Sequence, residues 1–282
     1  MSRELIVVTI PAYNEEKTLP FVINEIKRVM DLNNYNYKIL VVNDGSRDRT
    51  VEVAERNGAI VFSHSRNMGL AEAFKTEMKK CLELNADIIV HTDADGQYPS
   101  FYIPYLIKKI QEGYDLVLGS RFGHGQYNGS FMKRLGNIAF AKVFSGLLRI
   151  RLNDTTTGFR AFRKEVAELP MINNFTYTQE QLIRAGKGKM RITEIPIKTD
   201  KTRKSRLFKN SFDYALKAWI NILRIYRDFE PLKFFGSVGL FFILSGFLIG
   251  LRLIYLFMTT GKVGHVPSQV LTMLLIIVGV QI

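Results

Sequence analysis

The chain has 282 residues, of which 39 are Lys or Arg and 26 are Asp or Glu, so its formal net charge is +13. This length predicts one large core with an appendage, and the charge predicts attraction to phosphate in a nucleic acid, an anionic lipid or a phosphorylated substrate. The single cysteine, Cys81, excludes an intrachain disulfide and a cysteine-based zinc site, and we interpret it as a buried thiol.

Strands and helices are expected to alternate over the first 120 residues. Apolar and β-branched runs predict strands at 5–10, 37–42, 59–62, 88–90 and 115–118. Apolar residues at helical spacing predict helices at 19–30, from Ser46 or Asp48 to Gly58, from Leu70 to Met78 and at 102–110. This alternation predicts an α/β fold with a mainly parallel sheet and helices on both faces. No Gly-x-Gly-x-x-Gly follows the first strand and no Gly-Lys-Ser/Thr loop occurs, which argues against dinucleotide and P-loop sites.

The fourth strand runs into Asp93-Ala94-Asp95-Gly96-Gln97. In an extended chain residues i and i+2 point to the same side, so Asp93 and Asp95 could face one point. Two hard oxygen ligands at the carboxyl end of a strand suit Mg²⁺ or Mn²⁺ held together with a substrate diphosphate. The alternative interpretation is a simple turn, because Asp, Ala and Gly followed by Tyr-Pro are loop formers.

Beyond residue 122 the pattern loosens. A Gly, His, Asn and Ser-rich stretch at 123–130 predicts a loop. It is followed by an expected amphipathic helix at 131–148 bearing Lys133, Arg134 and Asn137. A polar turn from Asp154 then leads into a strand ending near Arg163, and a helix at 177–185 and a strand at 190–197 complete this part.

The last third of the chain predicts attachment to a membrane. Residues 201–233 contain nine Lys or Arg against three acidic residues, directly before an apolar run. We call residues 201–233 the basic collar. Its place beside the apolar run favours binding to the cytoplasmic face of a membrane over binding to a nucleic acid. Residues 212–229 suit a helix in the membrane interface, and 234–258 is long enough to span, with Arg252 near its far end. Residues 270–282 are apolar but number 13, so we expect the sequence to end inside a second span of a transmembrane hairpin.

Four motifs stand in a fixed order: Pro11-Ala12-Tyr13-Asn14-Glu15, Asn43-Asp44-Gly45-Ser46, Asp93-Ala94-Asp95-Gly96-Gln97 and Gly119-Ser120-Arg121. Together they resemble a family 2 glycosyltransferase with the GT-A fold, and within it the polyprenyl-phosphate sugar synthases such as dolichyl-phosphate mannose and glucose synthases. The resemblance predicts a GT-A domain at 1–210, juxtamembrane interfacial helices at 211–231 and a transmembrane region at 232–282.

The resemblance also implies roles for particular residues. Asp93, Asp95 and Arg121 would be catalytic, and Asp93, Asp95 and Gln97 would hold Mg²⁺ or Mn²⁺ with the diphosphate. The nucleotide would contact a set drawn from four segments: Pro11, Tyr13, Glu15, Asp44 (at the base or ribose), Asp93, Ala94, Arg206 and Lys209. The acceptor phosphate would contact Arg121, Lys133, Arg134 and Asn137.

The implied reaction moves a hexose from a nucleotide sugar to polyprenyl (dolichyl) phosphate at the cytoplasmic face. Because a phosphate monoester is already largely ionised at pH 7, with a second pKa near ~6, we expect in-line attack with inversion and no strong general base. Two departures from the mannose synthases, Asp95-Gly96-Gln97 where they usually carry Asp-Leu-Gln, and the segment Tyr177–Glu180, favour a UDP-hexose donor.

Several alternatives stay open from the sequence alone. The enzyme could be a GDP-mannose-dependent synthase, could transfer to a sugar hydroxyl with Glu180 as base, or could be an inactive membrane anchor. Glu15 could serve the helix that follows it, and Arg121 could form a fold-holding ion pair. Arg160 could form a structural pair or contact the acceptor. A homo-oligomer through the transmembrane helices is also open. The four histidines, His64, His91, His124 and His265, show no ligand spacing and are interpreted as structural or exposed.

Overall fold

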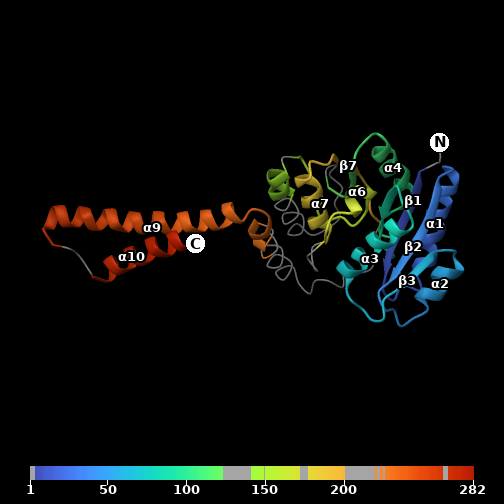
Figure 1. Cartoon of the computed structure of the whole chain (residues 1–282), viewed down its shortest axis with the longest axis horizontal. Coiled ribbons are helices and arrows are strands. Elements are labelled where there is room, and N and C mark those ends of the chain that lie inside the picture. The colour runs from blue at the N-terminus through green and yellow to red at the C-terminus, as the bar shows by residue number, and fades with distance from the viewer. Residues whose placement is uncertain are drawn as a thin grey trace. The chain divides into compact units, whose positions relative to one another are not determined.

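The structure is a computed structural model that describes residues 4–122, 141–148, 150–171, 177–200, 220, 223–224, 226–262 and 266–282. The chain divides into two compact units, residues 1–215 and 216–282. The first holds the sheet and the second holds two long helices (Figure 1).

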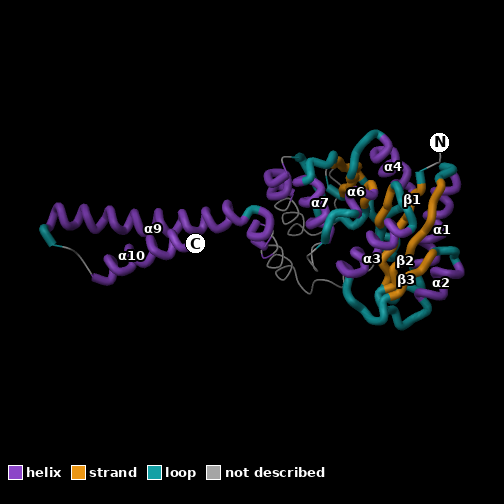
Figure 2. The backbone as a smooth tube through the Cα atoms, in the orientation of Figure 1, coloured by secondary structure: helices purple, strands orange, loops and turns teal. Residues whose placement is uncertain are grey.

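The first unit is built on a seven-stranded sheet with the order β3-β2-β1-β4-β6-β5-β7. Its strands are drawn in orange in Figure 2. The strands are β1 Leu5–Ala12, β2 Asn36–Asn43, β3 Ile60–Ser63, β4 Ile88–His91, β5 Leu116–Ser120, β6 Arg160–Arg163 and β7 Ile192–Pro196. Among the described residues four strand pairs are parallel, and β6 runs antiparallel to both β4 and β5. The predicted α/β fold with a mainly parallel sheet is confirmed.

Helices cover both faces of this sheet. They are α1 Leu19–Leu32, α2 Thr50–Arg56, α3 Leu70–Glu83, α4 Ile103–Gln111, α6 Lys164–Ala167 and α7 Tyr177–Lys187, with the 3-10 turn η1 at Ser100–Tyr102. One face packs its alternate strand residues, such as Ile6, Val8 and Ile10, against apolar residues of α1 and α4. On the other face Phe74 of α3 contacts Phe162 of β6 and Tyr177 of α7. Cys81 of α3 is fully buried, as predicted, and burial raises the pKa of its thiol well above the usual value.

Several elements differ in extent or position from the sequence prediction. Strand β1 continues through Pro11 and Ala12, which pair with Val42 and Asn43 of β2 instead of starting the loop. A short helix, α6, follows β6 directly, and the apolar pattern did not predict it. Asp48 accepts a hydrogen bond from the Thr50 backbone N–H at the start of α2, although the N-cap position itself is Arg49.

The second unit is a helical hairpin. Helix α9, Pro231–Thr260, has 30 residues and is long and apolar enough to cross a membrane. At 1.5 Å per residue it is about 45 Å long, more than the ~30 Å hydrocarbon core. Helix α10, Val266–Gln281, has 16 residues and packs against α9 through glycines. A Cβ added to Gly279 would lie 2.7 Å from the Gly239 carbonyl oxygen, so the two backbones touch there.

Candidate active site

Three adjacent strands deliver predicted site residues to one edge of the sheet. Strand β1 lies between β2 and β4 and is parallel to both, so the carboxyl ends of all three meet at the same edge. The Asp44 backbone N–H donates to the Ala12 carbonyl at 2.9 Å, which joins the loops after β1 and β2. Three of the four motifs therefore begin from neighbouring strand ends, and the fourth, Gly119-Ser120-Arg121, stands at the end of β5, which β6 separates from β4.

The loop after β1 is held by hydrogen bonds to the loop after β2. Asn14 has a left-handed backbone, with φ of 55°, and its N–H donates to the Ser46 hydroxyl at 2.9 Å. The buried Glu15 accepts a hydrogen bond from the Thr18 hydroxyl, 2.9 Å from its Oε2, just before α1 begins. The Glu15 carboxylate thus lies just before α1, and its helix-terminus role stays a prediction. Tyr13 is half-buried.

The loop after β2 packs tightly against residues 64–69. Gly45 has φ of +70°, and a Cβ there would lie 2.4 Å from the Arg66 carbonyl carbon. Asp44 is buried, and its Oδ1 lies 2.8 Å from Nδ1 of His64. His64, which the sequence left as structural or exposed, is thus the partner of a predicted nucleotide ligand.

The Asp93–Asp95 pair lies on a turn and not on an extended strand, because β4 ends at His91. The extended-chain argument is corrected here: Gly96 takes φ of +73°, and the Gln97 backbone N–H donates to Asp95 Oδ1 at 3.0 Å. The turn conformation foreseen as the alternative is therefore real. It still keeps both carboxylates at the sheet edge, where a ligand to the parallel strands would lie.

The surroundings of Asp93 fit a cation. Asp93 is partly buried, and burial raises the pKa of its carboxyl above the ordinary value, while the nearby charge of Asp95 adds to the rise and those of His91 and Arg121 oppose it. A Cβ on Gly158 would lie 3.3 Å from Asp93 Oδ1, so the glycine leaves space at this carboxylate. Paired hard oxygen donors under mutual repulsion suit Mg²⁺ or Mn²⁺. Within the described ranges no group of three or more His, Cys, Asp or Glu could hold a metal.

Arg121 follows β5 and forms an ion pair that fixes the fold. Its Nε and Nη2 donate to the two carboxylate oxygens of Asp154 at 2.7 and 3.0 Å, and Nη2 also donates to the Thr156 hydroxyl at 2.8 Å. The Asp154 side chain is fully buried and that of Arg121 is 19% exposed. The ion-pair alternative for Arg121 is therefore present, and Asp154 is a site residue that sequence reasoning passed over as part of a polar turn.

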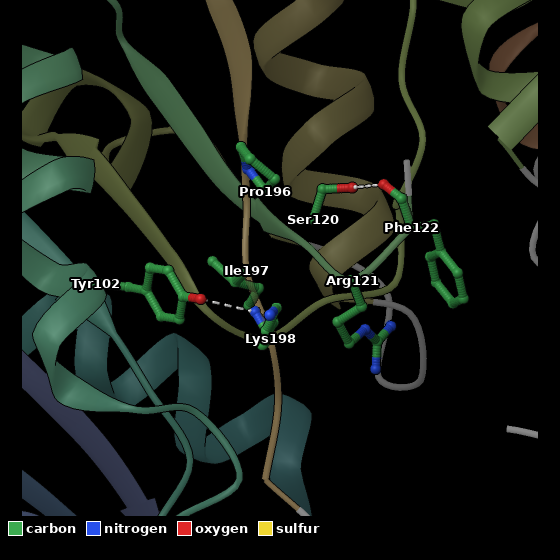
Figure 3. Close-up of a pocket in the computed structure, with 7 residues that line it drawn as sticks. All are labelled: Tyr102, Ser120, Arg121, Phe122, Pro196, Ile197 and Lys198. Atoms are coloured by element: carbon green, nitrogen blue, oxygen red, sulfur yellow. Dashed lines mark hydrogen bonds between the residues drawn. The ribbon is translucent and has the colours of Figure 1, made fainter. Parts of the chain in front are cut away.

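Arg121 also lines a pocket of about 260 Å³ at the ends of β5 and β7 (Figure 3). Tyr102 and Phe122 stand on opposite sides of this view with Ile197 and Lys198 between them. The Lys198 backbone N–H donates to the Tyr102 hydroxyl at 3.0 Å. The pocket combines cationic side chains with aromatic and aliphatic walls, a lining suited to a phosphate that carries an apolar group.

Further buried polar residues lie under the site. Arg160 is fully buried, burial lowers its pKa to about 10, and its guanidinium donates to the backbone carbonyls of Thr157 and Thr178. These contacts favour the structural role for Arg160. Glu180 of α7 is buried and paired with Arg184 at 2.6 Å. The role of Glu180 as a base toward a hydroxyl acceptor stays a prediction.

Five predicted site residues lie outside the described residues: Lys133, Arg134 and Asn137 for the acceptor phosphate, and Arg206 and Lys209 for the nucleotide. Their roles stay predictions. The interfacial position of residues 212–229 also stays a prediction, because most of these residues lie outside the described residues.

Comparison with known proteins identifies the class. Residues 7–169 match the model of glycosyl transferase family 2, more than half of the chain, and the chain belongs to this family. It is 35% identical over 191 residues to a dolichyl-phosphate hexose transferase of Haloferax volcanii, covering 67% of this chain and 80% of the relative. A UDP-N-acetylglucosamine–dolichyl-phosphate N-acetylglucosaminyltransferase of Methanococcus voltae is 34% identical, and the match covers 80% of this chain and 97% of that relative. A dolichol-phosphate mannosyltransferase of Pyrococcus furiosus is 32% identical, and the match covers 95% of this chain and 77% of that relative.

Solved structures confirm the GT-A fold. Glucosyl-3-phosphoglycerate synthase of Mycobacterium tuberculosis with Mn²⁺, UDP and phosphoglyceric acid aligns at a TM-score of 0.60 and 22% identity, covering 80% of this chain and 78% of that chain. The same enzyme with Mg²⁺ and UDP aligns at a TM-score of 0.60 and 23% identity, over 78% and 79% of the two chains. The protein is therefore an enzyme, a glycosyltransferase with a GT-A-like sheet.

Proposed function

We propose that this glycosyltransferase moves a hexose from a nucleotide sugar, with UDP-hexose favoured, to dolichyl phosphate, with inversion and with Mg²⁺ or Mn²⁺. The observation that carries the proposal is the juxtaposition at one sheet edge of a carboxylate turn after β4 and a cationic, apolar-walled pocket after β5. The charge of Arg121 opposes the rise that burial causes in the pKa of the Asp93 carboxyl, so the two features are electrostatically coupled. The printed names of the family 2 relatives, each a dolichyl-phosphate or dolichol-phosphate transferase, support the acceptor.

On the donor side, Asp93, Asp95 and Gln97 would hold the divalent cation together with the diphosphate. The cation, when bound, neutralises negative charge on the departing nucleotide. The mycobacterial neighbours were crystallised with Mn²⁺ or Mg²⁺ and UDP, which supports divalent metal use by this fold. Pro11, Tyr13, Glu15, Asp44 and Ala94 would line the nucleotide from the three neighbouring strand ends.

On the acceptor side, the pocket beside β5 would receive the phosphate and the first apolar unit of the lipid. Arg121 is fixed in place by Asp154, so it would meet the phosphate as a preorganised cation and not as a mobile one. Because the phosphate oxygen is already charged near pH 7, no side chain needs to remove a proton. The buried ion pair of Glu180 agrees with this assignment.

The membrane part would bring the enzyme to its acceptor. Helix α9 is a candidate span, and the basic collar before it favours a cytoplasmic position for the catalytic unit. A lipid acceptor and the enzyme would then be confined to the same membrane, which would raise their rate of encounter.

The deciding experiment incubates membranes containing the full chain with labelled nucleotide sugars and dolichyl phosphate. A panel of UDP-glucose, UDP-N-acetylglucosamine and GDP-mannose identifies the donor, and lability of the lipid product to mild acid identifies a glycosyl phosphate. We expect an acid-labile product from a UDP-sugar. An acid-stable glycosidic product would contradict the phosphate acceptor and would favour transfer to a hydroxyl acceptor.

The metal assignment has its own test. Asp95→Ala should lower turnover on the order of 10²-fold or more, by analogy with the loss of one electrostatic donor. In parallel, Mn²⁺ binding in the presence of UDP is followed by electron paramagnetic resonance, where the variant should leave most Mn²⁺ in solution. Glu52→Ala is the control, because Glu52 lies on α2 and its ion pair with Arg56 is exposed. Near-normal turnover of Asp95→Ala with metal present would show that the assignment is wrong.

A further inference from the structure

The carboxylate of Asp44 is largely occupied by the protein itself. Oδ1 lies 2.8 Å from Nδ1 of His64 and accepts the backbone N–H of Met68 at 2.8 Å, while Oδ2 accepts the backbone N–H of Gly69 at 2.8 Å. A carboxylate offers about four lone-pair positions, two on each oxygen. Among the contacts of the described residues, Oδ1 is therefore filled, and one acceptor position is left on Oδ2.

His64 cannot readily leave this position. Its side chain is 7% exposed, its Nε2 lies 2.8 Å from the Thr76 hydroxyl on α3, and its backbone N–H donates to the Asn43 carbonyl at 2.9 Å. Because a carboxylate oxygen only accepts hydrogen bonds, Nδ1 of His64 carries the proton and donates it toward Asp44 in either charge state of the ring. The Thr76 hydroxyl bonds the other ring nitrogen, Nε2, and holds the imidazole in this orientation. Nδ1–H therefore always donates to Oδ1 of Asp44.

Nucleobases differ in the number of N–H donors that they present to such a carboxylate. Guanine presents N1–H and N2–H side by side, and a bidentate pair with them needs one lone pair on each oxygen. Uracil presents a single N3–H, which needs one lone pair in total. With Oδ1 filled, Asp44 can serve a single donor but cannot pair with both donors of guanine, and an unpaired buried donor is strongly disfavoured.

We infer that His64 is a specificity-determining residue: by occupying Oδ1 of Asp44 it restricts the base site to a nucleotide with one N–H donor, uracil, and rejects guanine. This inference rests on the proposed function in one respect, that Asp44 contacts the base of the donor. His64 acts through Asp44 and is thus a positioning residue. It gives a physical reason for UDP over GDP that does not depend on the sugar.

The test measures binding of UDP and of GDP, each with Mn²⁺, to the full chain in detergent by titration calorimetry. We expect the wild type to bind UDP at least tenfold more tightly than GDP, the worth of about one hydrogen bond to a charged group. In His64→Leu the lone pair on Oδ1 becomes available, so GDP should bind more tightly than it does to the wild type and the preference should fall about tenfold. His64→Asn, whose amide N–H can replace Nδ1–H, should retain most of the preference.

Thr76→Val guards against a folding defect, because it removes the Nε2 partner and leaves the imidazole and Asp44 in place. It should lower the preference for UDP by less than His64→Leu does. GDP binding as tightly as UDP to the wild type would overturn the inference. So would an equal loss of both nucleotides in His64→Leu, the result expected if Asp44 contacts ribose or if His64 only stabilises the loop.

Calorimetry with nucleotides involves no acceptor, so it separates this inference from the proposed function. If UDP is preferred through His64 but no lipid product forms, the inference stands and the acceptor is wrong. If GDP-mannose yields an acid-labile dolichyl product, the phosphate acceptor stands and the inference fails.

Discussion

Removal of the Asp154 carboxylate should destabilise the catalytic unit more than any ion-pair substitution on its surface. In Asp154→Ala, the guanidinium of Arg121 loses two charge-assisted hydrogen bonds, at 2.7 and 3.0 Å, and stays mostly buried. Breaking a buried pair by removing one partner costs about 3 to 5 kcal/mol. For a folded unit of 215 residues, that corresponds to a fall in melting temperature of roughly 6 to 20 °C.

The chain offers a matched control of the same pair type. Glu52 and Arg56 on α2 form an ion pair at 2.6 Å, as short as that of Asp154, but their side chains are 43% and 73% exposed. Exposed helical pairs of this spacing contribute about 0.3 to 0.5 kcal/mol, so Glu52→Ala should leave the melting temperature almost unchanged. The two pairs are alike in length and differ in burial and in the further hydrogen bonds that Asp154 accepts from the Arg121 backbone and from Thr156.

The assay is thermal unfolding of the full chain in detergent, followed by the circular dichroism of the sheet-containing unit. A double-mutant cycle adds Arg121→Ala and Arg121→Ala/Asp154→Ala, and the double variant should be less destabilised than the sum of the single variants. If Asp154→Ala melts within about 1 °C of Glu52→Ala, the pair does not hold the fold, and the case for Arg121 as a preorganised cation is lost.

Two substitutions of glycine should be costly where backbones meet. Gly45→Ala would combine a left-handed φ of +70° with a 2.4 Å approach to the Arg66 backbone; it should cost at least about 1 kcal/mol and weaken UDP binding in calorimetry, whereas Gly146→Ala, with open space around it, should change neither. Gly279→Leu would drive a side chain into the α9 backbone, 2.7 Å away, and should lower the melting temperature of the hairpin in detergent. Gly236→Leu on α9, also in open space, is the control, and equal effects of the two leucines would refute close packing of the helices.

The sheet could be predicted from sequence because its strands are apolar on both faces. Residues 5–10, 37–42 and 115–118 can form little other than buried strands between helices, and parallel pairing follows from the alternation. The reversal at β6 could not be predicted in the same way. Its four residues, Arg160–Arg163, include two arginines, and their place between β4 and β5 is set by contacts far along the chain.

The site residues that belong to the ordered motifs could be predicted from the sequence. Those that are defined by a partner far along the chain could not. Asp93, Asp95, Asp44 and Arg121 follow strands, so their arrival at one edge follows from topology. His64 and Asp154 gave no such signal, since each is defined by a partner 20 or 33 residues away. A lone histidine in a loop and an aspartate before three threonines both look like ordinary turn residues.

These strand-end residues hold the structure as well as facing the proposed substrates. Asp95 closes its own turn through the Gln97 N–H, Asp44 anchors the 64–69 loop, and Arg121 holds Asp154. A loss of activity after substitution therefore cannot by itself separate misplacement from lost chemistry. The separation comes from comparing binding with stability: a contact made to a substrate changes an affinity ratio at constant melting temperature, whereas a purely structural contact lowers the melting temperature and weakens every ligand together. For this reason the nucleotide preference of His64→Leu and the melting temperature of Asp154→Ala are the two measurements that divide the roles.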